Sequence, residues 1–221
     1  MAERGAGLRA DAARNRERLV AAAREVFAAD GLGASLEEIA RRAGVRVGTL
    51  YHRFEGREAL VDAALIGRVE EAVDHAERAL AEPDPWHGLV DHLTALAAWQ
   101  AADRGFTDVC VAALPAGCAV EDAKRRGHAL TERLVARAHD ADVLRADVGL
   151  ADLGLLLWAV VRATDGVRET HPDAWRRHLA VLLDGLRADA AHPLPGTPLD
   201  DSAVQAAMAL PRGRRSGTTG T

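Results

Sequence analysis

The stretch from Ser35 to Phe54 reads SLEEIARRAGVRVGTLYHRF and predicts two short helices joined by a turn at Gly44. Ser35 followed by Glu38 is a capping box, in which the serine hydroxyl accepts a backbone N–H and the glutamate reaches back to the cap residue. We therefore expect the first helix to begin at Ser35. A helix, a glycine turn and a second short helix form the plan of a helix-turn-helix, whose second helix enters the major groove of DNA.

The two helices divide their residues between an apolar side and a side suited to contact with DNA. Ile39, Val45, Leu50 and Phe54 are expected to point inward and hold the pair on the preceding helix. Residues 41–57 carry five arginines against one glutamate, a local charge of +4 that would attract a polyanion, with a solvated helix face as the alternative interpretation. The side expected to be exposed on the second helix holds Arg46, Gly48, Thr49, His52 and Arg53, with Tyr51 at its edge.

Helical spacing of apolar residues continues on both sides of this stretch, and no segment shows the sustained alternation typical of strands. We predict an all-α protein. Asp30-Gly31 is expected to close the helix before the motif, and Pro172 to lie in the first turn of the last long helix. The expected helices beside the motif cover residues 11–29, 57–81, 86–103, 106–114, 120–139, 148–164 and 172–190.

This pattern predicts two domains and a tail. Residues 11–56 are expected to form a three-helix DNA-binding domain, and residues 57–191 a larger helical domain. Three prolines between residues 193 and 198, together with a glycine- and arginine-rich end, predict that residues 192–221 form a disordered tail.

The composition excludes several classes of protein. The chain has 221 residues, of which 48% are hydrophobic and 28% charged, and its mean hydropathy is −0.10, which is typical of a soluble globular protein. The densest apolar run, residues 153–161, is far shorter than the roughly 20 residues of a membrane span. Cys110 and Cys118 are the two cysteines, which favours free thiols in a reducing cytosol. We therefore expect a cytoplasmic protein with no membrane segment.

Three blocks of the N-terminal part resemble the TetR family of transcriptional regulators. They are RLVAAAREVFAADGL from Arg18, the stretch from Ser35 to Phe54, and REAL from Arg57, which follow the order and spacing of that family over about residues 14–65. The later segments ADRGF and LRADV resemble its SbtR-like subgroup. The resemblance implies a homodimer that binds a palindromic operator in double-stranded DNA. It also implies that residues 57–191 form the dimer interface and a pocket for an unknown small-molecule effector.

The resemblance further implies roles for individual side chains. Tyr51, Arg53 and Arg57 would contact phosphates, and Ser35 would add a contact at the start of its helix. The residues that would face base edges are Arg46, Val47, Gly48 and Thr49, with His52 beside them. The alternatives are a core position for Tyr51 and for Val47, and a surface position without a DNA contact for Arg46. Gly56 stands where the family usually has a better helix cap.

Bulky side chains in the larger domain are candidates for the pocket and the dimer interface, and core packing is the alternative for each pocket candidate. The side chains able to line an apolar pocket that also contains a polar group are Trp99, Phe106, His128 and Trp158. Residues 153–161 are apolar all round, so their helix must be covered on both sides, as expected if it meets both its own domain and a second copy. Together with the leucine stripe of the last long helix, the interface candidates are Leu156, Val160, Leu179, Leu182, Leu183 and Leu186.

The sequence carries no motif for catalysis, metal binding or a cofactor. GxSxG, P-loop and HExxH motifs are absent, and Gly31 and Gly33 follow a helix rather than a strand. We therefore expect no enzyme, no metal and no cofactor, and interpret the chain as a ligand-responsive repressor. The alternative function is an all-helical ligand-binding or interaction protein without DNA binding, which the intact motif and its arginines disfavour.

Overall fold

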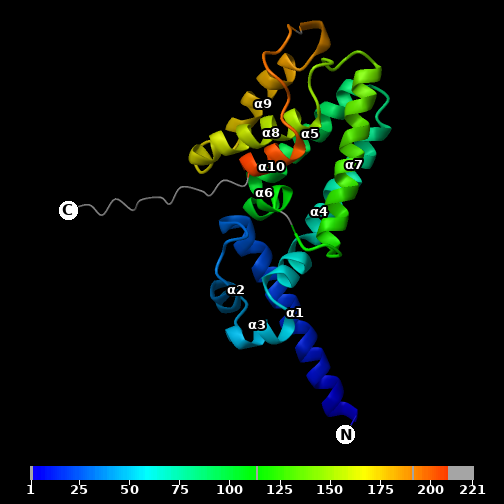
Figure 1. The fold of residues 1–221 in the computed structure, drawn as a ribbon. Coiled ribbons are helices and arrows are strands. Elements are labelled where there is room, and N and C mark those ends of the chain that lie inside the picture. Colours follow the sequence, from blue (N-terminus) through cyan, green and yellow to red (C-terminus); the bar gives the residue numbers. More distant parts are fainter. Residues whose placement is uncertain (1, 113, 191, 209–221) are drawn as a thin grey trace, which may run out of the picture.

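A computed structural model describes residues 2–112, 114–190 and 192–208. Across these residues every regular element is helical apart from an isolated bridge between Leu144 and Arg187, so the expected all-α class is confirmed. Figure 1 shows a small part built around α1, α2 and α3 and a larger part formed by the later helices. The α-helices are α1 (Ala2–Asp30), α2 (Leu36–Arg42), α3 (Val47–Arg53), α4 (Arg57–Ala81), α5 (Pro85–Ala102), α6 (Arg104–Val111), α7 (Ala119–Asp140), α8 (Leu150–Thr164), α9 (Ala174–Gly185) and α10 (Asp201–Met208).

The small part is a three-helix unit that shares one apolar core. Phe27 of α1, Ile39 of α2 and Leu50 of α3 are fully buried there. The first turns of α4 add Leu60 and Leu65 to the same core, so the expected domain boundary at residue 57 crosses a packed cluster. The α2–α3 pair is therefore held in place by α4 as well as by α1.

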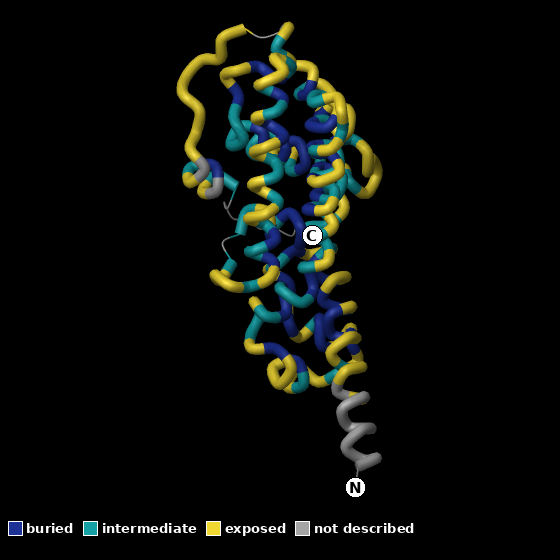
Figure 2. Tube along the Cα trace, turned by 90° about the vertical axis from the view of Figure 1, so that its right-hand side faces the viewer, coloured by how far each residue is buried: buried dark blue, intermediate teal, exposed yellow. Residues whose placement is uncertain are grey.

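The larger part packs α4, α5 and α7 together and sets α8 and α9 against α5. α4 and α7 run side by side over most of their length (Figure 1). A second core joins these helices through Leu89, Leu134, Leu153 and Trp175, all buried. Figure 2 shows that buried positions follow the interior of both parts, while exposed positions follow the outer faces of the helices.

Several helix boundaries differ from those expected. α1 begins at Ala2 instead of residue 11. α6 begins at Arg104 rather than residue 106, because the Asp103 carboxylate caps it by accepting the N–H of Phe106 at 2.9 Å. α9 covers only Ala174–Gly185, so Pro172 lies before the helix and not in its first turn. Past the end of α9, Ala188 N–H donates to the carbonyl of Val143 at 3.2 Å, so the chain there is bonded to the segment after α7.

The chain after α9 also corrects the expectation of a disordered tail over residues 192–221. Arg145 is buried, pairs with Asp147 at 2.6 Å, and donates to the carbonyl of His192. The N–H of Leu194 donates to the same Asp147 carboxylate at 3.1 Å. α10 then packs on α8 with Val204 buried. The rest of the expected tail, residues 209–221, lies outside the described residues.

Candidate nucleic-acid interface and cavity

The turn between α2 and α3 depends on a glycine in the left-handed region. Gly44 has a φ of +67°, which residues with a side chain rarely adopt. The following N–H, from Val45, donates to the carbonyl of Ala40 at 3.0 Å and closes the turn. This geometry sets the angle at which α3 leaves α2.

Ser35 caps α2 as expected, since the N–H of Glu38 donates to Ser35 Oγ at 3.3 Å. The other half of the expected capping box is not formed, because the Glu38 carboxylate accepts from the Arg41 guanidinium at 2.7 Å. That hydrogen bond holds the pKa of Glu38 below its ordinary value. The Ser35 hydroxyl donates to the Glu37 carboxylate at 2.6 Å, so it is engaged within the protein, and its contact with DNA stays a prediction.

One face of α3 is open to solvent. Tyr51 is 56% exposed and Val47 is 37% exposed, so neither occupies the core position considered as an alternative. Thr49 is half-buried and follows the exposed Gly48, while the next residue, Leu50, is fully buried. The other expected contact residues on and beside α3 are Arg46, Gly48, His52 and Arg53.

The arginines near this face differ in their partners. Arg41 and Arg42 both pair with Glu38, and Arg42 also pairs with Glu25, so two carboxylates offset these two charges. Arg46 and Arg53 have no ion pair in the described part of the chain. The positive charge available to a phosphate group is therefore concentrated at the two ends of α3.

Arg57 stands at the start of α4 and has a role that the sequence did not reveal. Its Nη1 donates to the carbonyl oxygens of Leu32 and Ala34, each at 2.7 Å, and so ties α4 to the turn before α2. Its contact with phosphate stays a prediction for its remaining N–H groups. Gly56, expected only to be a weaker cap, has a φ of +96° and ψ of −174°, a conformation essentially restricted to glycine.

α6 joins the two parts of the molecule. A Cβ added at Gly105 would lie 2.9 Å from Phe27 Cβ and 3.1 Å from the Phe27 carbonyl oxygen, so only glycine permits this approach of α6 to α1. Arg104 donates to a carbonyl near the end of α1 at 2.9 Å, and the Asp108 carboxylate accepts the N–H of Leu32 at 2.9 Å. A movement of α6 would therefore be passed directly to α1.

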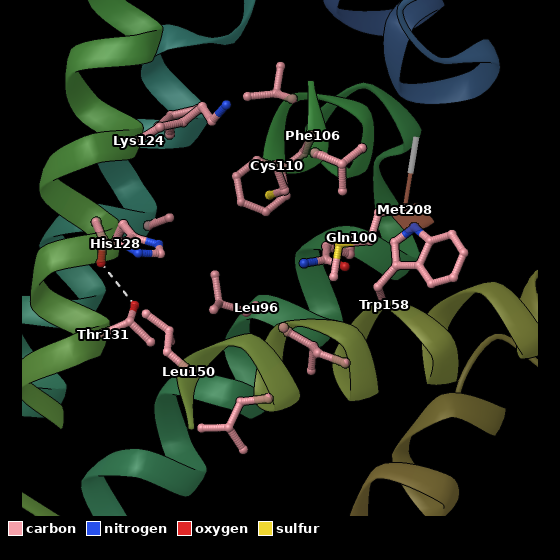
Figure 3. Close-up of a pocket in the computed structure, with 18 of the residues that line it drawn as sticks. Leu96, Gln100, Phe106, Cys110, Lys124, His128, Thr131, Leu150, Trp158 and Met208 are labelled. Carbon is pink, nitrogen blue, oxygen red and sulfur yellow. Dashed lines mark hydrogen bonds between the residues drawn. The ribbon is translucent and has the colours of Figure 1, made fainter. Parts of the chain in front are cut away.

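A cavity of about 430 Å³ lies between α4, α5, α6, α7, α8 and α10 (Figure 3). Of the four predicted pocket residues, Phe106, His128 and Trp158 line it. Trp99 does not, because its ring packs edge-on against His75 and Phe106 in the core. Sequence reasoning missed Gln100, His92 and Thr131 as lining residues. It also missed the part of the cavity wall that α10 supplies through Val204 and Met208. The spacing of four residues between these two apolar side chains could have predicted a helix with one apolar face.

The polar groups of the cavity are few. His92 Nε2 lies 3.0 Å from Thr131 Oγ1, and burial lowers the pKa of His92 to about 4. Gln100 Oε1 is buried without a hydrogen-bond partner among the described residues. Lys124 Nζ donates to the carbonyl of Ala112 at 2.7 Å and to the Glu121 carboxylate at 3.2 Å. The cavity is therefore an apolar space with isolated polar atoms.

The expected dimer residues divide into two groups. Leu156 and Leu182 are half-buried, whereas Val160, Leu179, Leu183 and Leu186 are buried in the core of the same protomer, and the contact of these residues with a second copy stays a prediction. The apolar side chains that do reach the surface of α8 and α9 include Ala159 and Val181, and the Val181 side chain is 66% exposed.

Among the described residues, no three His, Cys, Asp or Glu side chains are placed to hold a metal ion. No described helix is long and apolar enough to cross a membrane.

Comparison with family models gives a match for each part. Residues 19–64 match the model described as bacterial regulatory proteins, tetR family. Residues 84–188 match the one described as transcriptional regulator SbtR-like, C-terminal domain.

Curated relatives match mainly the N-terminal part. The HTH-type transcriptional regulators SrpR and TtgW, both of Pseudomonas putida, are each 43% identical over 60 residues, 27% of this chain. The matched stretch spans 28% and 45%, respectively, of the length of these two relatives.

Solved structures match most of the chain. The TetR transcriptional regulator SCO0520 of Streptomyces coelicolor is 32% identical, with a TM-score of 0.51 over 78% of this chain and 98% of its own. A TetR transcription regulatory protein of Mycobacterium vanbaalenii is 39% identical over 81% of this chain and 99% of its own, with a TM-score of 0.46.

Proposed function

Since the chain belongs to the TetR family of bacterial regulatory proteins and is a DNA-binding transcriptional regulator rather than an enzyme, we propose that it is a repressor. It binds an inverted-repeat operator as a homodimer, and a small molecule in the cavity releases it.

The single observation that carries this proposal is the open face of α3. Arg46 and Arg53 stand at its two ends without an ion pair in the described part of the chain, and Tyr51 is exposed between them. Unpaired arginines can bind phosphate without first breaking a bond within the protein. Arg46 lies at the N-terminal end of α3, the end that meets base edges when such a helix enters the major groove.

Dimerisation is supported by the outer surface of α8 and α9. Leu156, Ala159, Val181 and Leu182 are small or apolar and reach this surface, as a packed interface between two helix pairs requires. Two copies related by a two-fold axis would present their α3 helices to successive major grooves, about 34 Å apart.

Release by a ligand is supported by the place of α6. Phe106 lines the cavity, while its neighbour Gly105 touches Phe27 in the DNA-binding part. A molecule that displaces Phe106 would therefore shift α1 and the α2–α3 pair. The coupling energy typical of such systems, about 1–3 kcal/mol, corresponds to a roughly 5- to 150-fold loss of operator affinity.

Selection of binding sites from random double-stranded DNA tests the proposal. The recovered sequences should contain an inverted repeat with half-sites about one helical turn apart, and transcription from a promoter that overlaps this site should fall when the protein is added. The double variant Arg46→Ala/Arg53→Ala should enrich no sequence. The matched variant Arg78→Ala/Arg133→Ala, which removes two exposed arginines from α4 and α7, should enrich the same repeat. Enrichment by the first variant would refute the proposal.

A further inference from the structure

Two buried polar atoms on α5 have no hydrogen-bond partner in the described part of the chain, and both residues line the cavity. They are Gln100 Oε1 and His92 Nδ1. Gln100 is only 8% exposed and His92 only 2%, so these two atoms do not form hydrogen bonds with water at the protein surface. Figure 3 shows Gln100 beside Trp158 and Met208 on one side of the cavity, facing Lys124 and His128 on α7. A buried acceptor left unpaired is costly, which favours a ligand that satisfies it.

The hydrogen bonds around His92 show which kind of group is missing. Thr131 Oγ1 donates its one proton to the carbonyl of Gly127 at 2.9 Å. It must therefore accept from His92 Nε2, 3.0 Å away, which places the ring hydrogen on Nε2 and leaves Nδ1 as an acceptor. Burial keeps this ring neutral at physiological pH. Gln100 Oε1 is an acceptor as well, so both unpartnered atoms require a donor.

The charged groups around the cavity are already paired. Lys124 binds Glu121, and Arg125 donates to Asp122 at 2.7 Å. A charged ligand would lose its hydration without gaining a free counter-charge, so the cavity favours a neutral one. The remaining wall is mostly aliphatic or aromatic, including Leu96 and Leu157.

We propose that the cavity binds a neutral, largely apolar molecule with a hydroxyl group, an alcohol or a phenol, whose O–H donates to Gln100 Oε1. Gln100 then determines specificity for the hydroxyl, while the apolar wall holds the body of the molecule. The volume of about 430 Å³ lies within the roughly 300–1,000 Å³ typical of small-molecule pockets. The inference rests on the proposed function only in treating this cavity as the effector site.

Calorimetric titration of the full chain with three matched probes tests the hydroxyl requirement. They are para-hexylphenol, its methyl ether, which lacks the donor, and para-hexylbenzoate, which is charged. The phenol should bind about tenfold more tightly than the ether, the effect expected of one hydrogen bond to a buried acceptor. The benzoate should bind more weakly than the phenol. Failure of the phenol to bind, or equal or tighter binding of the ether or the benzoate, would overturn the inference.

Two variants assign the effect to Gln100. Gln100→Met keeps the length of the side chain and removes the acceptor, so the phenol-to-ether ratio should fall to about one while the ether still binds. Met208→Leu changes the cavity wall without changing a polar group, so the ratio should persist. An unchanged ratio in Gln100→Met would refute the role of Gln100, and retained ether binding shows that this variant is folded.

The titrations contain no DNA, which separates this inference from the proposed function. If the phenol-to-ether affinity ratio is near one in a protein that still binds its operator, the inference is overturned and the proposed function is not. A ratio of about ten, with operator binding unaffected by the phenol, supports the inference and refutes release through this cavity.

Discussion

Replacement of Arg53 by alanine should reduce the salt dependence of operator binding. Arg53 is exposed at the end of α3 and has no ion pair in the described residues, so its full charge is available to a phosphate. Each phosphate contact in duplex DNA contributes about 0.9 to the slope of log affinity against log salt concentration. A dimer loses one contact per protomer, so the slope should become shallower by about 1.8.

The assay is fluorescence anisotropy with labelled operator at several salt concentrations. Between roughly 0.05 and 0.2 M salt, the affinity of the wild-type protein should fall about tenfold more than that of Arg53→Ala. Arg53→Lys keeps the charge and should keep the slope. Arg78→Ala removes an exposed arginine that lies roughly 30 Å from the start of α4, and it should leave the salt dependence of operator affinity unchanged.

Two results would refute this reasoning. One is an unchanged slope in Arg53→Ala, which would mean that the side chain does not meet a phosphate in the complex. The other is a loss of preference for a single base pair with the slope intact, which would place Arg53 among the residues that contact bases.

Three further predictions concern stability and assembly. Gly105→Ala should lower the free energy of unfolding by about 1–3 kcal/mol in urea denaturation, because its Cβ would lie 2.9 Å from Phe27 Cβ. In Gly67→Ala the nearest atom to the added Cβ lies 3.9 Å away, so this control should raise the free energy of unfolding by about 0.5–1 kcal/mol. Folding lowers the pKa of His92 from 6.5 to about 4, so the unfolded chain binds more protons between these pH values and acid favours unfolding. Stability should fall by up to about 3 kcal/mol as pH drops through this range, and by clearly less in His92→Gln. Val181→Asp should give monomers in sedimentation velocity, and a variant that remains dimeric would place the interface elsewhere.

The parts of the fold that sequence reasoning predicted well depend on signals only a few residues apart. Ser35 and Gly44 mark the two ends of α2 through a cap and a left-handed turn, and both occur as expected. The bounds of α4 were predicted because Gly56 precedes this helix and Pro83 follows it. The open face of α3 follows from the period of its apolar residues.

The remaining features depend on contacts between residues distant in sequence. Arg57 donates to carbonyl groups more than 20 residues away, and nothing in its local sequence shows that partner. The leucine stripe of α9 has a helical period, but the period does not show whether its own domain or a second copy covers Leu179 and Leu183. The position of α10 depends on Arg145 and Asp147, which are distant from it in sequence. A prediction from composition alone therefore assigned this segment to a disordered tail.

The most direct test of the central claim, that α3 reads an inverted repeat, is site selection with the single variant Arg46→Ala. Arg46 stands at the start of α3, where an arginine can donate two hydrogen bonds to guanine. The variant should enrich the same inverted repeat as the wild-type protein, with relaxed preference at one position that is symmetric in the two half-sites. The mismatch penalty at that position should fall by about 1–3 kcal/mol. A variant that keeps every base preference of the wild type, or a wild-type selection that yields no symmetric site, would contradict the account.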